Sequence, residues 1–327
     1  TIIIILAAGC ISNFSATFLS HFFGMWIYSF DLSLISPASE QELKAYWQFE
    51  LPAFISNDKA MFAAITAGLT IAKSPYQISA NILNKIDFLI NQLLDIITIL
   101  IPIIVLGFLI KLAHDEVMSL IIHDYGFILM IIASVQFAYI MTLYWLVNSA
   151  NLQNFISTVR NMMTTAISGF TSMSSAAVMP LTIIAASKNA DNKELVRSII
   201  PVTVNIHLIG DCIAIPIFAY AILKNYGMFI PDIGSYLIFA CYFVVAKFSV
   251  AAIPGGGIIV MLPILQSYLG FNAEMSMLIT AIYILFDPVI TCANIMGNGA
   301  FAKFIDKLVS VNQPFHISNS SYILPLI

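Results

Sequence analysis

The sequence predicts an all-α integral membrane protein. Apolar residues make up 60% of its 327 residues and charged residues only 9%, and its mean hydropathy is +0.94. So few charges cannot give the charged surface that keeps a protein soluble in water. A helix needs ~20 mostly apolar residues to cross a bilayer. The stretches that satisfy this requirement are residues 2–30, 51–72, 88–113, 126–148, 195–224 and 275–302.

The charge distribution excludes nucleic acid as a partner and predicts the orientation of the chain. The net charge of −4 leaves no basic face. Short loops with Lys and Arg stay in the cytoplasm, and these residues occupy alternate connections, for example near Arg160, Lys193 and Lys303. We therefore expect a protein of the plasma (inner) membrane with a cytoplasmic C-terminus. Segment 31–50, which carries Glu40 and Glu42, should then face outside.

Known cofactor motifs are missing from the sequence. Cys10, Cys212, Cys241 and Cys292 stand alone in apolar surroundings, without the close spacing of zinc or disulfide sites. Phosphate-binding loops and cofactor fingerprints are also absent. We expect no cofactor, and an ion gradient, of sodium or protons, as the energy source.

The composition changes near residue 150. Residues 1–148 resemble ordinary lipid-facing spans, which are typical of a scaffold. In residues 149–310, polar and small residues occur in the middle of segments that should be buried. Residues 311–327 form a tail without informative motifs. Functional residues are therefore expected in 149–310.

Two segments of this core are predicted to be re-entrant hairpins. Residues 152–188 contain two apolar arms around a serine-rich sequence, and residues 232–270 contain two arms around Pro254-Gly255-Gly256-Gly257. Each arm is too short to cross a ~30 Å hydrocarbon core. Non-helical backbone at membrane depth needs protein or water around it, so we expect the two tips to meet.

Each hairpin is followed by a span with polar residues at mid-depth, predicted to be broken there. In 195–224 these residues include Asn205, His207 and Asp211; in 275–302 they include Asp287 and Asn294. The loop charges place the entry of the first hairpin in the cytoplasm and that of the second outside. A unit repeated with opposite orientation, with discontinuous helices at the midplane, is typical of secondary transporters.

The order and spacing of these motifs resemble one family. The serine-rich tip SMSSAAVMP (172–180), the second tip AIPGGG (252–257), and Asp287, Thr291 and Asn294 of the last span are similar to the dicarboxylate/amino acid:cation symporters. The likeness runs from about residue 1 to residue 307.

The resemblance implies a fold of eight spans and two hairpins, of which the first two spans lie outside this sequence. It further implies a homotrimer and an elevator mechanism, in which a transport domain slides across the membrane. That domain would contain the hairpins and the two polar spans, with parts of 1–30 and 123–148.

Carried over residue by residue, the resemblance implies an amino acid site. Asp287 would bind the α-ammonium group, and Thr291 and Asn294 would add hydrogen bonds from the same helix face. The tips, with Ser174 and Ser175 in the first and Gly256 in the second, would hold the carboxylate.

The substrate position departs from the family pattern. Ile290 stands where the family has an arginine for a side-chain carboxylate, which favours a neutral amino acid over a dicarboxylate. Lys247 is the nearby cation that could replace that arginine. The alternative interpretation of Lys247 is a lysine that extends to the membrane interface.

The cation positions depart as well. The family's Asn-Met-Asp-Gly-Thr motif falls on residues 207–211, with Ile209 and Asn298 in place of two carboxylates, which weakens sodium coupling. His207 and Asp211, spaced four residues apart, could share a helix face and hold a proton. The alternatives are a structural role for His207 and a displaced sodium site at Asp211.

Two other functions remain open at this point. A degenerate relative that lost its cation ligands could act as an uncoupled channel or a sensor. An intramembrane hydrolase could use Ser174 or Ser175 with His207, or Asp287 with Asp211, but the sequence has no G-x-S-x-G pattern.

Overall fold

The computed structural model describes residues 2–30, scattered residues between 63 and 110, residues 117–250, residue 252 and residues 254–311. The described part is helical, without strands. Spans 51–72 and 88–113 are described only at scattered residues. Segment 31–50, with Glu40 and Glu42, and the tail beyond residue 311 lie outside the described residues.

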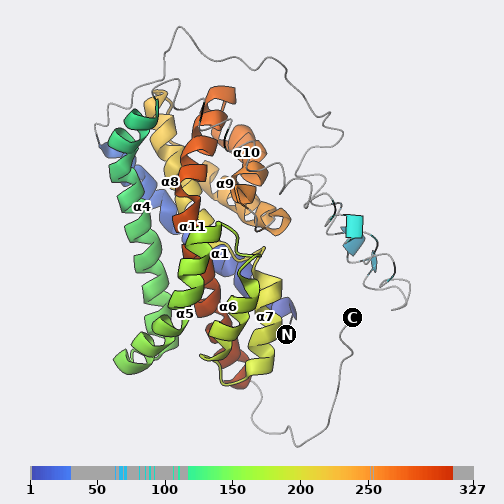
Figure 1. The fold of residues 1–327 in the computed structure, drawn as a ribbon. Coiled ribbons are helices and arrows are strands. Elements are labelled where there is room, and N and C mark those ends of the chain that lie inside the picture. Colours follow the sequence, from blue (N-terminus) through green and yellow to red (C-terminus); the bar gives the residue numbers. More distant parts are fainter. Residues whose placement is uncertain are drawn as a thin grey trace, which may run out of the picture.

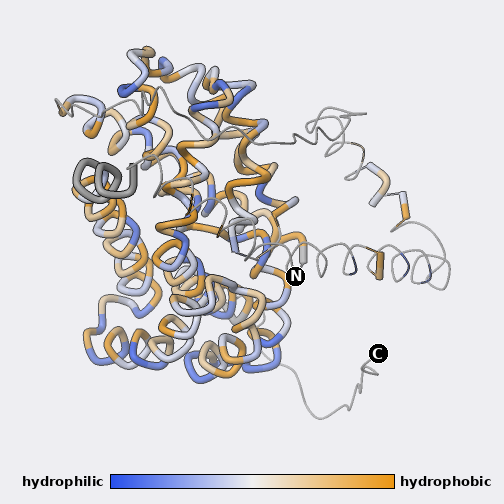
Figure 2. The backbone as a smooth tube through the Cα atoms, turned by 45° about the horizontal axis from the view of Figure 1, so that its top comes forward, coloured by the Kyte–Doolittle hydropathy of each residue, from blue (hydrophilic) through white to orange (hydrophobic). Residues whose placement is uncertain are grey.

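Three of the described helices are long and apolar enough to cross a membrane. They are α1 (Ile2–Ser29), α4 (Val117–Val147) and α11 (Ala273–Val311). Large apolar side chains such as Ile3, Ile11 and Met130 are exposed on α1 and α4, and Figure 2 shows hydrophobic residues along much of the length of the helices. An apolar exterior of this kind is suited to lipid and not to water.

The first predicted hairpin is present as a pair of helices, but the prediction that both arms are short is wrong, because the first arm has 21 residues, enough to cross a bilayer. The two helices are α5 (Leu152–Ser172) and α6 (Met179–Ser187). The side chain of Asn151 caps the start of α5, and Met173 ends that helix in the left-handed conformation, with φ of 52°. Pro180 lies in the first turn of α6, where a missing N–H is tolerated.

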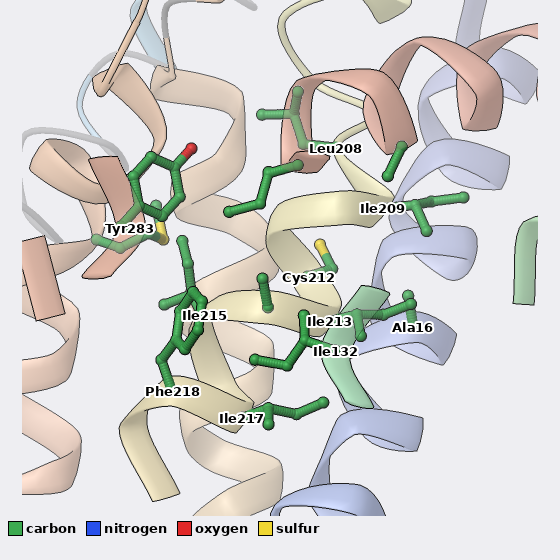
Figure 3. Packing of buried hydrophobic residues seen from close by; sticks show 14 of the residues in the cluster. Ala16, Ile132, Leu208, Ile209, Cys212, Ile213, Ile215, Ile217, Phe218 and Tyr283 are labelled. Atoms are coloured by element: carbon green, nitrogen blue, oxygen red, sulfur yellow. The ribbon is translucent and has the colours of Figure 1, made fainter. Parts of the chain in front are cut away.

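The span after this hairpin is broken, as predicted. It consists of α7 (Lys193–Thr203) and α8 (Ile209–Asn225), separated by the non-helical residues 204–208. Every residue of α8 from Ile209 to Leu223 is buried. Figure 3 shows apolar side chains of α8 packed against neighbours such as Ala16 and Ile132. Helix α8 is therefore the centre of the core.

The second hairpin has the same plan. It consists of α9 (Ile233–Ala246), the short 3-10 helix η1 (Lys247–Ser249) and α10 (Gly256–Leu269). Asp232 caps the start of α9. Gly255, with φ of +71°, turns the chain into α10 in a conformation that costs other residues energy.

The expected break in the last span is not observed, and this prediction is wrong. Helix α11 continues from Ala273 to Val311 with Pro288 inside it. A proline removes only one backbone donor, and the polar residues of this segment point to neighbouring elements without interrupting the helix. The last span thus presents Asp287, Thr291 and Asn294 from regular helical positions.

The two hairpins lie toward opposite ends of the molecule, α5–α6 below and α9–α10 above in Figure 1. Helix α11 contacts both hairpins as well as α8. The described core therefore consists of two units, each a hairpin followed by a span, with their tips directed toward the middle.

Candidate functional site

The break between α7 and α8 is stabilised by a side chain from α1. Asn13 donates from Nδ2 to the carbonyl oxygen of Ile206 at 2.6 Å, and its Oδ1 accepts the N–H of Leu208 at 3.2 Å. Both backbone groups would otherwise lack a partner in the core, which costs about 1–3 kcal/mol each. These two hydrogen bonds therefore stabilise the non-helical conformation between α7 and α8.

The tips of the two hairpins meet at the carbonyl group of Ala252. The hydroxyl of Ser174 donates to this oxygen at 2.9 Å, and the N–H of Ala176 donates to it at 3.3 Å. The N–H of Ala252 donates to Oδ1 of Asn205, in the break, at 3.0 Å. The predicted meeting of the two tips with the broken span is confirmed.

Asp287 joins α11 to the second tip. Its side chain is buried, with 4% of the residue exposed. One carboxylate oxygen accepts the N–H of Gly255 at 2.8 Å, and the other accepts the hydroxyl of Thr291 at 3.0 Å. The start of α10 is therefore fixed by a carboxylate, which favours a helix N-terminus.

Asp211 is the second buried carboxylate and has three polar neighbours. The hydroxyl of Tyr283 donates to Oδ1 at 2.8 Å, and Nδ2 of Asn294 donates to Oδ2 at 2.7 Å. Nζ of Lys247 lies 3.4 Å from Oδ1 in an ion pair. Asn294 also accepts the N–H of Gly210 at 2.8 Å, so it links α11 to the start of α8.

These groups surround a small polar cavity with a volume of ≈ 20 Å³, room for about one water-sized molecule. Both hairpins, α8 and α11 contribute to its wall. The residues that line it are Met173, Ser175, Leu208, Asp211, Val250, Ala252, Gly257, Tyr283, Asp287, Thr291 and Asn294.

Most of the residues predicted for the site come together here. Ser175, Asp287, Thr291 and Asn294 line the cavity, and so does Asp211. Ser174 is buried at the contact between the tips. Gly256 begins α10, and its neighbour Gly257 faces the cavity.

The expected pairing of His207 with Asp211 is wrong. Helix α8 begins at Ile209, so His207 precedes it and shares no helix face with Asp211. Its ring nitrogens instead lie 3.2 Å from Oδ1 of Asn298 and 2.9 Å from the hydroxyl of Ser12, and the ring stacks on Phe301. His207 and Asn298 therefore form a separate polar cluster with α1.

The alternative interpretation of Lys247 as a lysine at the membrane interface is also wrong. Its side chain is fully buried, and Nζ lies 4.7 Å from the centre of the Phe243 ring as well as beside Asp211. The side chain begins in η1, which follows α9, and its charge pairs with Asp211 at 3.4 Å. The lysine is thus part of the buried site.

Sequence reasoning missed several residues that shape the site. Tyr283, which stands where the family has an aspartate, and Gly257 of the second tip were not predicted as site residues, and Asn13 and Gln136 interrupt long apolar runs and could have been noticed. Gln136 donates from Nε2 to the carbonyl group of Gly210 at 2.8 Å. The test that singled out Asp287, a polar residue within a span, applies to these two residues as well.

Within the described residues, no three His, Cys, Asp or Glu side chains gather as a metal site would require. The hydrolase hypothesis also lacks geometry in this part of the chain: the Ser174 hydroxyl bonds to Ala252 and the N–H of Ala177, and His207 to Ser12 and Asn298. A nucleophile and its base would lie within hydrogen-bond reach.

Comparison with known proteins establishes the family. No curated protein sequence matches the chain. The family profile of the sodium:dicarboxylate symporters, however, matches residues 3–308, nearly the whole length. Its members are transporters, so the enzyme hypothesis is set aside. The chain belongs to the sodium:dicarboxylate symporter family and is an integral membrane transporter.

Proposed function

We propose that this protein is a cation-coupled symporter for a small amino acid, with a neutral amino acid favoured over a dicarboxylate. The observation that supports the proposal best is the cavity between the hairpin tips, α8 and α11, with Asp287, Thr291 and Asn294 in its wall. The sequence resemblance predicts an amino acid site at these same residues.

Asp287 is the proposed partner of the substrate's ammonium group. Its two oxygens each accept one hydrogen bond from the described residues, and a carboxylate oxygen can accept a further one. A buried carboxylate is unfavourable without a positive partner. An α-ammonium group would supply that charge in the cavity.

The opposite wall is suited to the substrate's carboxylate. Ser175 lines the cavity from the first tip, and Gly257 lies in the first turn of α10 in the second. Hydroxyls and the N–H groups of a helix start are donors for an anion. Ser174, with its hydroxyl on Ala252, is proposed to hold the tips together beside the bound molecule.

The absence of a basic side chain in the cavity wall supports the preference for a neutral substrate. None of the described residues that line it is Lys, Arg or His. Ile290 is fully buried, and Lys247 is paired with Asp211. A second carboxylate on the substrate would therefore enter without a cation and close to Asp211 and Asp287, at a large electrostatic cost.

The small volume of the cavity implies movement. A space of ≈ 20 Å³ is too small for an amino acid. We propose that the hairpins are re-entrant, that a tip opens to admit the substrate, and that the hairpins move as one body with α8 and α11, as an elevator. We further propose an inner-membrane homotrimer with a cytoplasmic C-terminus, as in the expectations from sequence.

The proposal is tested by uptake of radiolabelled amino acids and dicarboxylates into proteoliposomes under imposed sodium or proton gradients. Asp287→Asn keeps the shape of the side chain and removes its charge. We expect uptake to fall about tenfold to hundredfold, the value of a hydrogen bond to a charged group. Asp232→Asn, at the exposed cap of α9, is the matched control.

Each outcome of that experiment is informative. Concentration of a neutral amino acid, lost in Asp287→Asn but not in Asp232→Asn, supports the proposal. A preference for a dicarboxylate would overturn the neutral specificity. If no solute were concentrated against any gradient, the proposal would give way to the alternative, an uncoupled channel or sensor.

A further inference from the structure

Lys247 is a buried charged residue that the proposed transport scheme has not used. Within the described residues its Nζ atom has no hydrogen-bond partner; it lies 3.4 Å from Asp211 and over the ring of Phe243. The residue is fully buried and belongs to η1, next to the second tip. An ammonium group in this position is held by charge alone.

The charged and titratable groups around Lys247 come from two helices. Helix α8 contributes Asp211 and Cys212, and α11 contributes Tyr283, which donates to Asp211, and Asp287, whose charge acts on Asp211. Within this group, the lysine pairs with Asp211, and both carboxylates contact the second hairpin.

The energetics require a cation beside Asp211. A buried carboxylate without a positive partner is strongly unfavourable, even with neutral hydrogen-bond donors. Tyr283 and Asn294 supply such donors but no charge. In a carrier driven by an inorganic cation, the ion would supply the charge; here the protein supplies it from its own chain.

On the Oδ1 side of Asp211 the geometry leaves no space for an additional ion, because Gly257 and Lys247 both face this oxygen. Gly257 packs so closely that a Cβ atom there would collide with Oδ1 of Asp211 and the hydroxyl of Tyr283. The same oxygen faces Nζ of Lys247. The side of the carboxylate directed toward the second hairpin is thus already occupied.

We propose that the Lys247 ammonium is a tethered cation that takes the place of sodium at Asp211, so that substrate transport does not require sodium. This inference rests on the proposed function. Lys247 thereby becomes the residue that decides which cation the carrier depends on, and it connects the second tip to α8 without a dissociable ion.

The decisive measurement uses the wild-type protein in proteoliposomes. Exchange of the labelled substrate between two sides of equal composition needs no gradient, so it reports whether the carrier works at all. Uptake and exchange are then compared in sodium and in choline. We expect rates within about twofold of each other in the two media, because the required charge is covalently bound.

Removal of the lysine should reverse this behaviour. In Lys247→Ala the side chain leaves a space beside Asp211, and we expect exchange in choline to fall at least about a hundredfold, as for a broken buried ion pair. Sodium or methylammonium should restore it. Lys224→Ala is the control, because Lys224 also lies over an aromatic ring, that of Tyr28, at the end of α8.

The outcomes separate the inference from the function on which it rests. If exchange occurs in sodium but is lost in choline for the wild type, Lys247 does not replace sodium and the inference is wrong. If exchange fails in every medium, the proposed function itself fails. Should Lys247→Ala not fold, the wild-type comparison still decides, because it involves no substitution.

Discussion

The two hairpin tips are held in different ways. The first tip is held by neutral groups: Ser174 and Ala176 donate to the carbonyl group of Ala252. The second tip is held by charged side chains. Gly255 donates to Asp287, and Lys247 forms an ion pair with Asp211.

This difference indicates which hairpin responds to ligands. Neutral hydrogen bonds contribute about 1 kcal/mol each and change little with ionic conditions. The second tip is attached to two carboxylates, those of Asp287 and Asp211. Carboxylates bind cations and ammonium groups. A substrate that binds Asp287 therefore alters the attachment of the second tip directly, whereas the hydrogen bonds that attach the first tip to Ala252 involve no charged group.

The largest expected effect is that of Asp211→Asn. The substitution keeps the shape and leaves Lys247 buried without a counter-charge, so we expect a loss of about 3–5 kcal/mol in the free energy of unfolding. Thermal unfolding in detergent measures it. Asp232→Asn should change stability little, because asparagine caps helices as well as aspartate does.

The double variant Asp211→Asn/Lys247→Met sharpens this prediction. With both charges removed, much of the lost stability should return, since a buried pair contributes less than the cost of leaving one member alone. Equal losses in the single and the double variant would mean that the second tip is not held by the ion pair.

The hairpins could be predicted from sequence because their signals are local. Two arms around a serine-rich or glycine-rich turn identify α5–α6 and α9–α10, and the polar run through Asn205 and His207 marks the break before α8. Asp287 stood out because a carboxylate within a span is costly. Each of these signals lies within about one helix length.

The pairing of side chains could not be predicted, because it depends on contacts between distant segments. Lys247 and Asp211 belong to different units of the core, and nothing in either sequence segment indicates the other. The spacing of His207 and Asp211 suggested a shared face, but the helix begins between them at Ile209. Local spacing is informative only where the helix is continuous.

A smaller effect is expected for Gly257→Ala, which acts on the second tip through shape. The added Cβ would collide with Asp211 and Tyr283, and overpacking of this kind costs about 1–3 kcal/mol. Uptake should fall about tenfold or more, because the second tip can no longer pack against Asp211 and Tyr283. Gly126→Ala in α4, where nothing lies within 4 Å of the added atom, is the control. Similar losses in both variants would contradict this explanation.

The smallest effect belongs to the first tip. Ser174→Ala removes two neutral hydrogen bonds, to the carbonyl group of Ala252 and from the N–H of Ala177, but the N–H of Ala176 still donates to Ala252, so we expect a loss of about 1–2 kcal/mol in stability. Ser168→Ala, whose hydroxyl bonds only within its own helix, is the matched control. Substrate affinity from uptake kinetics should stay within about fivefold of the wild type. A much larger loss of affinity with unchanged stability would place the Ser174 hydroxyl on the substrate itself, and the contrast between a neutral and a charged tip would then no longer explain which hairpin responds to ligands.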